Sequence, residues 1–288
     1  MFKKFAAPAV VALTAFVANP AAAAFEDFCV NSLALAGTSA TALNTDLING
    51  ANGCSNGSVR GFTADKLNGL YSEVLQVTAT TNPGILSFQS TVFVNWGQYA
   101  RNDGGVGILG LETLLENQYD LYAIVRASGT LSLASGQFSA SNASLELYAD
   151  QFLSAGGAIT RLGTGAPGSN FTGLNPNLSG TVDDRLLLTG SYLSGFGSAS
   201  APGRFTFSFD NIALSPLGNS YFIAPRPFYF GVLSDGDVDT LGFNVTGPGR
   251  FELVGDISAN FFRVPEPGSL ALAGLALLGL GIATRRKA

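Results

Sequence analysis

The amino-acid sequence predicts an all-β protein: an antiparallel β-sandwich or barrel-like body with one short helix, followed by a C-terminal transmembrane helix. Glycine supplies 36 of the 288 residues and only 12% are charged, a composition that suits short strands joined by tight turns. Residues 204–211 alternate strictly, so that Phe205, Phe207 and Phe209 share one face of a strand. With 47% hydrophobic residues, the chain can bury a core.

The body begins with two β-branched and aromatic runs, residues 71–79 and 85–96, separated by Thr-Asn-Pro-Gly at 81–84. This arrangement predicts a β-hairpin. Residues 109–118 predict the one short helix, because three leucines in this segment fall on one helical face. Further strands are predicted at residues 120–127, 130–133, 145–148, 185–189, 204–211, 228–233, 249–254 and 257–264.

The middle of the body is rich in Gly, Asn and Pro at residues 163–169 and 171–180. These segments predict one long irregular loop, either a loose surface connection or a binding feature. No charged or low-complexity linker divides residues 25–263. The sequence therefore predicts a single β-rich body over this range, since one sandwich or barrel can reach roughly 250 residues.

Residues 1–24 have the three parts of a secretory signal peptide. Two lysines lie close to the start, residues 5–17 are apolar, and Ala22 and Ala24 are small residues that suit signal peptidase. We expect export through the Sec translocon and cleavage after Ala24, with either of the two preceding alanines as the alternative. An uncleaved anchor is a further alternative, but the apolar run is shorter than the roughly 20 residues that a membrane span needs.

The C-terminus carries a second signal in three parts. Val264-Pro265-Glu266-Pro267 precedes residues 268–284, which hold no charge, and Arg285-Arg286-Lys287 follow. At 1.5 Å per residue the uncharged run makes a helix of about 25 Å, enough to cross a thin hydrocarbon core. The basic cluster would keep the extreme C-terminus in the cytoplasm and leave the body outside. A plain tail anchor with a proline linker is the alternative that physical reasoning leaves open.

The order of these three parts resembles the PEP-CTERM sorting domain. The resemblance covers residues 264–288 and implies a protein of a Gram-negative bacterium that is exported, held transiently in the cytoplasmic membrane and then processed by exosortase. It also implies residence at the cell surface or in the extracellular matrix. Both end signals would be removed, which leaves residues 25–264 as the working, extracellular protein.

The composition excludes several classes of function. The chain has no histidine, so it can hold neither a Ser-His-Asp triad nor a zinc site of the His-Glu-x-x-His type. Between residues 25 and 264, ten basic residues stand against nineteen acidic ones, a net charge near −9. This balance argues against nucleic acid as a partner, because phosphate binding needs clustered Lys and Arg.

Cys29 and Cys54 are the only thiols in the chain. A pair this sparse in an exported protein predicts a disulfide, and closing a loop of about 26 residues would contribute roughly 3.5 kcal/mol. A free, lipidated or catalytic cysteine is the alternative. The structural bridge is favoured, because the chain has no histidine to activate a thiolate and no lipobox before Cys29.

Asp235, Asp237 and Asp239 alternate along the chain with a spacing that suits calcium. An EF-hand is excluded, because its glycine and glutamate positions are occupied here by Thr240 and Thr246. A tight hairpin turn built on Asp-Gly, with solvated carboxylates, explains the pattern better, and a weak extracellular calcium site is the alternative. No other cofactor is expected.

Carboxylates are the hydrolytic groups that this composition leaves, since glycosidases need only two acids at a suitable separation. The acids in the middle of the body stand in no motif, so a solvated surface role explains them better than catalysis. They are Glu112, Glu116, Glu146, Asp150, Asp183 and Asp184.

A second resemblance covers short segments of the body, at residues 62–69, 71–74, 120–123 and 147–150. They are similar to flocculation-associated PEP-CTERM proteins, which implies a role in bacterial aggregates or biofilms held together by exopolysaccharide. We therefore predict a non-enzymatic surface or matrix protein. A secreted glycan-active enzyme that uses paired carboxylates and a carbohydrate-binding module are the alternatives.

Overall fold

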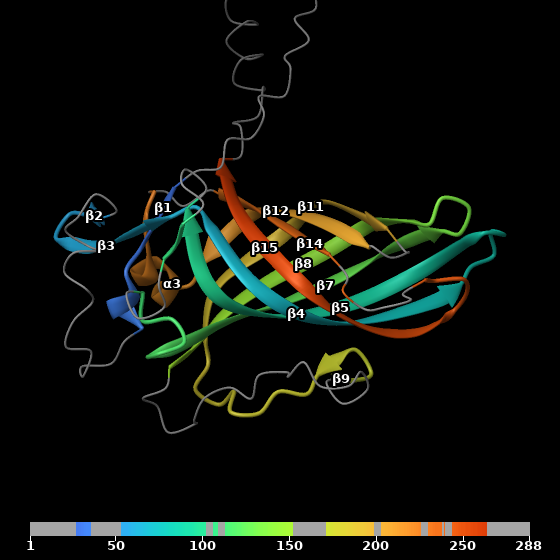
Figure 1. Ribbon diagram of the computed structural model, residues 1–288, viewed down its shortest axis with the longest axis horizontal. Coiled ribbons are helices and arrows are strands. Elements are labelled where there is room, and N and C mark those ends of the chain that lie inside the picture. Colours follow the sequence, from blue (N-terminus) through green and yellow to red (C-terminus); the bar gives the residue numbers. More distant parts are fainter. Residues whose placement is uncertain are drawn as a thin grey trace, which may run out of the picture.

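The computed structural model describes residues 27–35, 53–101, 106–108, 113–151, 171–198, 203–225, 230–237, 239 and 244–263. The predicted signal peptide, the predicted C-terminal helix and the predicted loop at 163–169 lie outside these residues. Within them the fold is all-β and antiparallel, as the sequence predicts (Figure 1). No helix in this described part is long and apolar enough to span a membrane.

Eight long strands form a closed up-and-down barrel, in which each strand pairs with the next one along the chain. The last of them pairs with the first, so the sheet closes on itself. The strands are β4 (Lys66–Ala79), β5 (Ile85–Arg101), β7 (Tyr119–Ser132), β8 (Gln137–Gln151), β11 (Arg185–Ser198), β12 (Arg204–Leu214), β14 (Phe230–Asp237) and β15 (Gly249–Arg263). A short strand, β6 (Val106–Ile108), pairs with the far end of β5. Of the two predicted architectures, the structure is therefore the barrel.

The strands are longer than the sequence predicts, because glycines that resemble turn positions lie within them. The predicted strand at 120–127 and residues 130–132 of the next predicted strand both belong to β7. Gly129, between them, marks a bulge opposite β8. A Cβ atom at this position would collide with the backbone carbonyl of Ser139. The glycine thus permits a close approach of two strands and does not end one.

One end of the barrel, at the left of Figure 1, is covered by a small second sheet. It consists of β13 (Phe222–Ala224), β1 (Phe28–Val30), β3 (Val59–Ala64) and β2 (Gly53–Asn56), in that order. The 3-10 helix η1 (Ser32–Ala34) and the helix α3 (Pro216–Tyr221) complete this plug. The ring of Phe28 lies 4.1 Å from that of Phe261 in β15, measured between centroids. We call this the plugged end, and the opposite end, with the β4–β5 and β7–β8 turns, the hairpin end.

Of the predicted helix at 109–118, residues 109–112 lie outside the described part of the chain, Thr113 is helical, and residues 114–118 are not. Leu115 makes an isolated bridge, and residues 116–118 form a turn. Leu114 and Glu116 have φ angles of 64° and 62°, in the left-handed region, which a right-handed helix cannot contain. Leu114 and Leu115 are nevertheless buried and belong to the main hydrophobic core.

The helix that the sequence analysis did not predict is α3. Ser215 caps it, since its Oγ accepts a hydrogen bond from the Gly218 N–H at 2.9 Å. Pro216 occupies the first turn, where its missing N–H costs nothing. A serine followed by proline is a recognised start signal for a helix, but only six residues follow before the next strand.

The segment at 171–180, predicted as irregular loop, contains a small hairpin of β9 (Phe171–Thr172) and β10 (Asn175–Pro176). Phe171 is buried against Val74, Phe93 and Tyr122, which form a second hydrophobic cluster separate from the barrel interior. The hairpin therefore packs against the outer face of the barrel and is not a loose connection (Figure 1).

Candidate functional site

A cavity lies inside the barrel at the hairpin end. It encloses about 40 Å³ and has a mainly apolar wall. Side chains alternate between the two faces of a strand, and those that line this space from β4 and β5 are Glu73, Leu75, Phe88, Ser90 and Val92. The polar residues of the wall are Glu73, Ser90, Ser198 and Arg204, and five phenylalanines also contribute, Phe88, Phe138, Phe196, Phe205 and Phe207.

Glu73 is an acidic residue on the inner face of β4. The flanking inward residues, Tyr71 and Leu75, belong to the main hydrophobic core. The Ser90 hydroxyl of β5 donates a hydrogen bond to Glu73 Oε1 at 2.5 Å. Burial raises the pKa of Glu73 to about 7, although the hydrogen bond from Ser90 acts in the opposite direction. A carboxyl group is thus placed in an apolar interior with one neutral partner.

A second, smaller cavity of about 20 Å³ lies deeper in the barrel. Trp96, the only tryptophan of the chain, contributes to its wall and is 5% exposed. Among the described residues, the Trp96 indole N–H has no hydrogen-bond partner. The remaining wall is apolar and consists of Leu67, Val94, Ala123, Val125, Leu145, Leu147, Leu188, Phe209, Ala259 and Phe261.

The plugged end is closed by a buried cluster of tyrosine hydroxyls. Tyr221, the last residue of α3, is hydrogen-bonded to Tyr99 and, at 2.9 Å, to Tyr119. The Tyr119 hydroxyl also meets Ser32 Oγ at 3.1 Å. Burial raises the pKa of all three tyrosines, that of Tyr119 to about 12, so they stay neutral. These contacts join both helical segments of the plug to the barrel.

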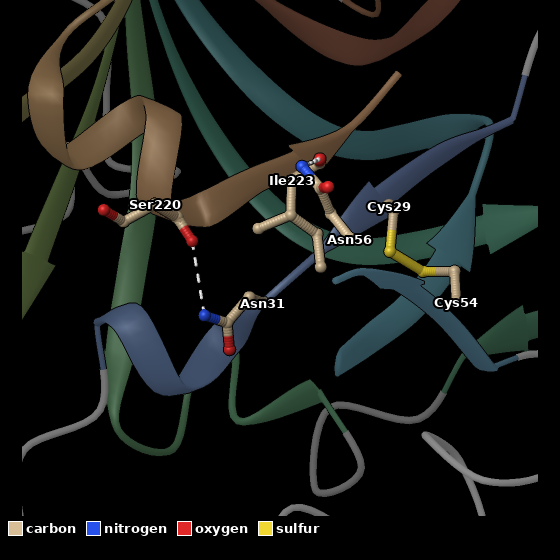
Figure 2. The surroundings of a disulfide bond; sticks show 6 residues. All are labelled: Cys29, Asn31, Cys54, Asn56, Ser220 and Ile223. Carbon is tan, nitrogen blue, oxygen red and sulfur yellow. Dashed lines mark hydrogen bonds between the residues drawn. A yellow bond between two sulfur atoms is a disulfide. The ribbon is translucent and has the colours of Figure 1, made fainter. Parts of the chain in front are cut away.

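The plug is fastened by the disulfide between Cys29 of β1 and Cys54 of β2, whose Cα atoms are 5.9 Å apart (Figure 2). Both strands flank β3. Side-chain amides tie the same region to the segment around β13. Asn56 Nδ2 donates to the Ile223 carbonyl at 2.8 Å, and Asn31 Nδ2 donates to that of Ser220 at 3.3 Å. The disulfide therefore joins two strands within the plug, and the hydrogen bond from Asn31 holds the start of the described chain against a segment 189 residues later.

Three acids meet on the described part of the chain: Asp150 at the end of β8, and Asp183 and Asp184 just before β11. One carboxylate oxygen from each lies within 4.8 Å of the others, an arrangement that could hold a cation. Asp150 is completely buried, and Tyr122 donates a hydrogen bond to Asp184 Oδ2 at 2.5 Å. Burial raises the pKa of Asp184, and the neighbouring charge of Asp183 adds to this effect. The sequence names these acids but cannot show that they converge.

The sequence analysis expects Asp235, Asp237 and Asp239, the residues considered for calcium, in a tight hairpin turn, but the structure places them elsewhere. Asp235 and Asp237 lie within β14, where they pair with β12, so the predicted hairpin turn at these residues is wrong. Their alternation is that of a strand paired on both sides, since Asp235 also pairs with Ser258 of β15. Asp239 follows the strand, and its backbone N–H donates to the Val254 carbonyl at 2.9 Å.

Several predicted site residues lie outside the described part of the chain. They are Ala22 and Ala24 of the signal peptide, the Val264-Pro265-Glu266-Pro267 motif, and the Arg285-Arg286-Lys287 tail. The sequence analysis in turn missed Glu73, Ser90 and Trp96. One signal was available for Glu73, which occupies an inward position of the alternating series Tyr71, Leu75 and Val77.

Comparison with known proteins identifies the C-terminal segment. The PEP-CTERM protein-sorting motif matches residues 263–287. No curated protein and no solved structure matches the chain. The resemblance of the body to flocculation-associated proteins therefore stays a prediction. The matched motif begins at the last residue of β15, so the chain carries a PEP-CTERM sorting motif directly after its closing strand.

Proposed function

We propose that this protein is a non-enzymatic component of the cell surface or extracellular matrix of a Gram-negative bacterium, where it supports flocculation or biofilm formation together with exopolysaccharide. The sorting motif itself supports the coarser statement that the chain is exported, transiently anchored in the membrane and processed by exosortase. The proposed role in the matrix rests on the properties of the β-barrel body that exosortase processing would release.

The observation that carries the proposal is the place of the sorting motif in the fold. The motif begins at Arg263, the final residue of the strand that closes the barrel. Processing there would release a closed barrel whose plug is fastened by a disulfide. A disulfide-bonded body with a net charge near −9 suits a protein that must stay folded and soluble outside the cell.

Absence of histidine supports a non-enzymatic role, because it removes the commonest general base. The acids that the barrel brings together, Asp150, Asp183 and Asp184, are the groups on which a glycan-active enzyme would have to depend. They are tied into the fold by Tyr122, which bonds to Asp184, and by the burial of Asp150. This arrangement favours a structural role for them.

The aggregation role can be tested in the source bacterium. In a strain that lacks the gene, we expect dispersed cells, and expression of the full-length chain should restore settling aggregates. A matched chain with alanines at residues 265–267 should be made at the same level but fail to restore them. Wild-type settling in the deletion strain would refute the proposed role.

Binding and catalysis are separated by incubating the purified, processed protein with the host exopolysaccharide. We expect the protein to sediment with the polymer and to release no new reducing ends. A rise in reducing ends that is lost in Asp184→Asn would instead establish the glycan-active alternative. Glu146→Gln, which changes a half-buried acid on β8 that pairs with Arg126, is the control.

A further inference from the structure

We propose that the barrel interior binds one small amphiphile, an apolar molecule whose hydroxyl or amine head donates a hydrogen bond to Glu73. The site comprises the cavity at the hairpin end and the smaller cavity behind it. It goes beyond the matrix role, which requires no internal ligand.

The two cavities follow one another along β5. Val92 lines the outer cavity, and Val94 and Trp96 line the inner one. Glu73 is paired with Val92 in the register of β4 and β5. Since a strand rises about 3.3 Å per residue, roughly 13 Å separate the level of Glu73 from that of Trp96. An elongated ligand with its head at Glu73 would therefore extend its tail toward Trp96.

The inner cavity suits an apolar tail and not water. A buried water needs two to four polar partners, whereas the wall offers the Trp96 indole N–H and otherwise only apolar side chains. Apolar cavities of this kind stay dry and accept apolar guests. The phenylalanines around the outer cavity extend the same apolar surface toward the hairpin end.

The head of the ligand is specified by Glu73. Its carboxyl group accepts the Ser90 hydroxyl, and an ionised carboxylate has acceptor capacity for further donors. A hydroxyl or an ammonium group can supply such a donor, and an ammonium also gains from opposite charge and from nearby aromatic faces. A carboxylate head would be repelled. Arg204, at the start of β12, is the other charged residue of the wall.

A ligand would enter from the hairpin end. Phe196, which lines the outer cavity, is 65% exposed, so the cavity reaches the protein surface at this residue. The opposite end is blocked by the hydrogen-bonded hydroxyls of Tyr99, Tyr119 and Tyr221. The plug thus makes the barrel a cup with one accessible end, a form that can hold one small ligand.

The test compares octylamine, octanol and octanoate, which share one tail and differ in the head, by titration calorimetry of the processed protein at pH 8. Emission of Trp96 reports whether the tail reaches the inner cavity. We expect octylamine and octanol to bind one molecule per chain and to change this emission. Octanoate should bind at least about tenfold more weakly. Tightest binding of octanoate, or binding of none of the three, would overturn the proposal.

Two variants locate the site. Glu73→Gln should weaken octylamine by about tenfold or more but octanol by less than about threefold, because the amide oxygen still accepts a hydrogen bond. Ala140→Leu should fill the outer cavity and abolish binding of both. Glu146→Gln is the matched surface control and should leave both affinities unchanged. Equal affinity of octylamine for wild type and Glu73→Gln would place the ligand elsewhere. Because Gln is nearly isosteric with Glu, this variant still tests the site if Ala140→Leu does not fold.

Discussion

Replacing Glu73 by glutamine should make the stability of this protein much less sensitive to pH. Burial raises the pKa of Glu73 from its ordinary value of 4.5 to about 7. The folded state therefore binds a proton between these two values that the unfolded chain has already released. Glutamine resembles the protonated carboxyl in size and charge, so the variant keeps the neutral side chain at every pH.

The direction and the size of the effect follow from proton linkage. A group whose pKa is higher in the folded state stabilises that state below its unfolded pKa, and this stabilisation is lost as the pH rises through its folded pKa. A rise from 4.5 to about 7 corresponds to about 3 kcal/mol. Wild type and Glu73→Gln should therefore be similarly stable near pH 4, and the variant should be more stable by about 3 kcal/mol at pH 8.

Urea unfolding, followed by the fluorescence of Trp96, measures this difference from pH 4 to pH 8. The titrations of all other groups, including Asp184, are common to both proteins and cancel in the difference. Glu146→Gln, in which the acid that pairs with Arg126 at the surface is changed, should show no such rise. A difference between wild type and Glu73→Gln that stays flat across this range would show that Glu73 is not in a desolvated interior.

Three further predictions concern the plug and the sorting signal. Cys29→Ala should lower the free energy of unfolding by about 3.5 kcal/mol without abolishing the fold, and equal melting curves of wild type with and without reductant would contradict it. Gly218→Ala should cost about 1–3 kcal/mol in thermal unfolding, because its Cβ would collide with the Leu187 carbonyl of β11. Gly136→Ala, whose Cβ would meet no atom within 4 Å and which is strained only by its positive φ, should cost less. Alanines at residues 265–267 should leave export intact but trap the chain in the membrane fraction, and wild-type release into the medium would contradict this.

The alternating faces of the strands could be predicted from the sequence, whereas the closure of the barrel could not. Phe205, Phe207 and Phe209 define an inward face by their spacing alone, and they pack in or against the main core. Closure depends on pairs such as Lys66 with Asn260, and no local pattern specifies a partner almost two hundred residues away. The sequence is therefore compatible with both a sandwich and a barrel, and the pairing of β15 with β4 distinguishes them.

The candidate site shows the same limit. The alternation along β4 is consistent with an inward Glu73. The sequence does not show that Ser90 is its hydrogen-bond partner or that phenylalanines from β8, β11 and β12 line the same cavity. The acids Asp150 and Asp184 likewise come together through the pairing of β8 with β11. The strand lengths could not be predicted either. Gly129 resembles a turn residue and so divides the predicted strand in two, whereas in the structure it lies within β7 at a bulge.

The position of the closing strand at the end of the chain has a consequence for the completeness of the released protein. A chain that stops before β15 leaves β4 and β14 each without one partner, and unpaired strand edges of this kind promote aggregation. The same truncated chain also lacks the sorting motif, which begins at Arg263. Only a chain long enough to complete its barrel therefore carries the sorting motif, so a truncated chain with open strand edges also lacks this motif.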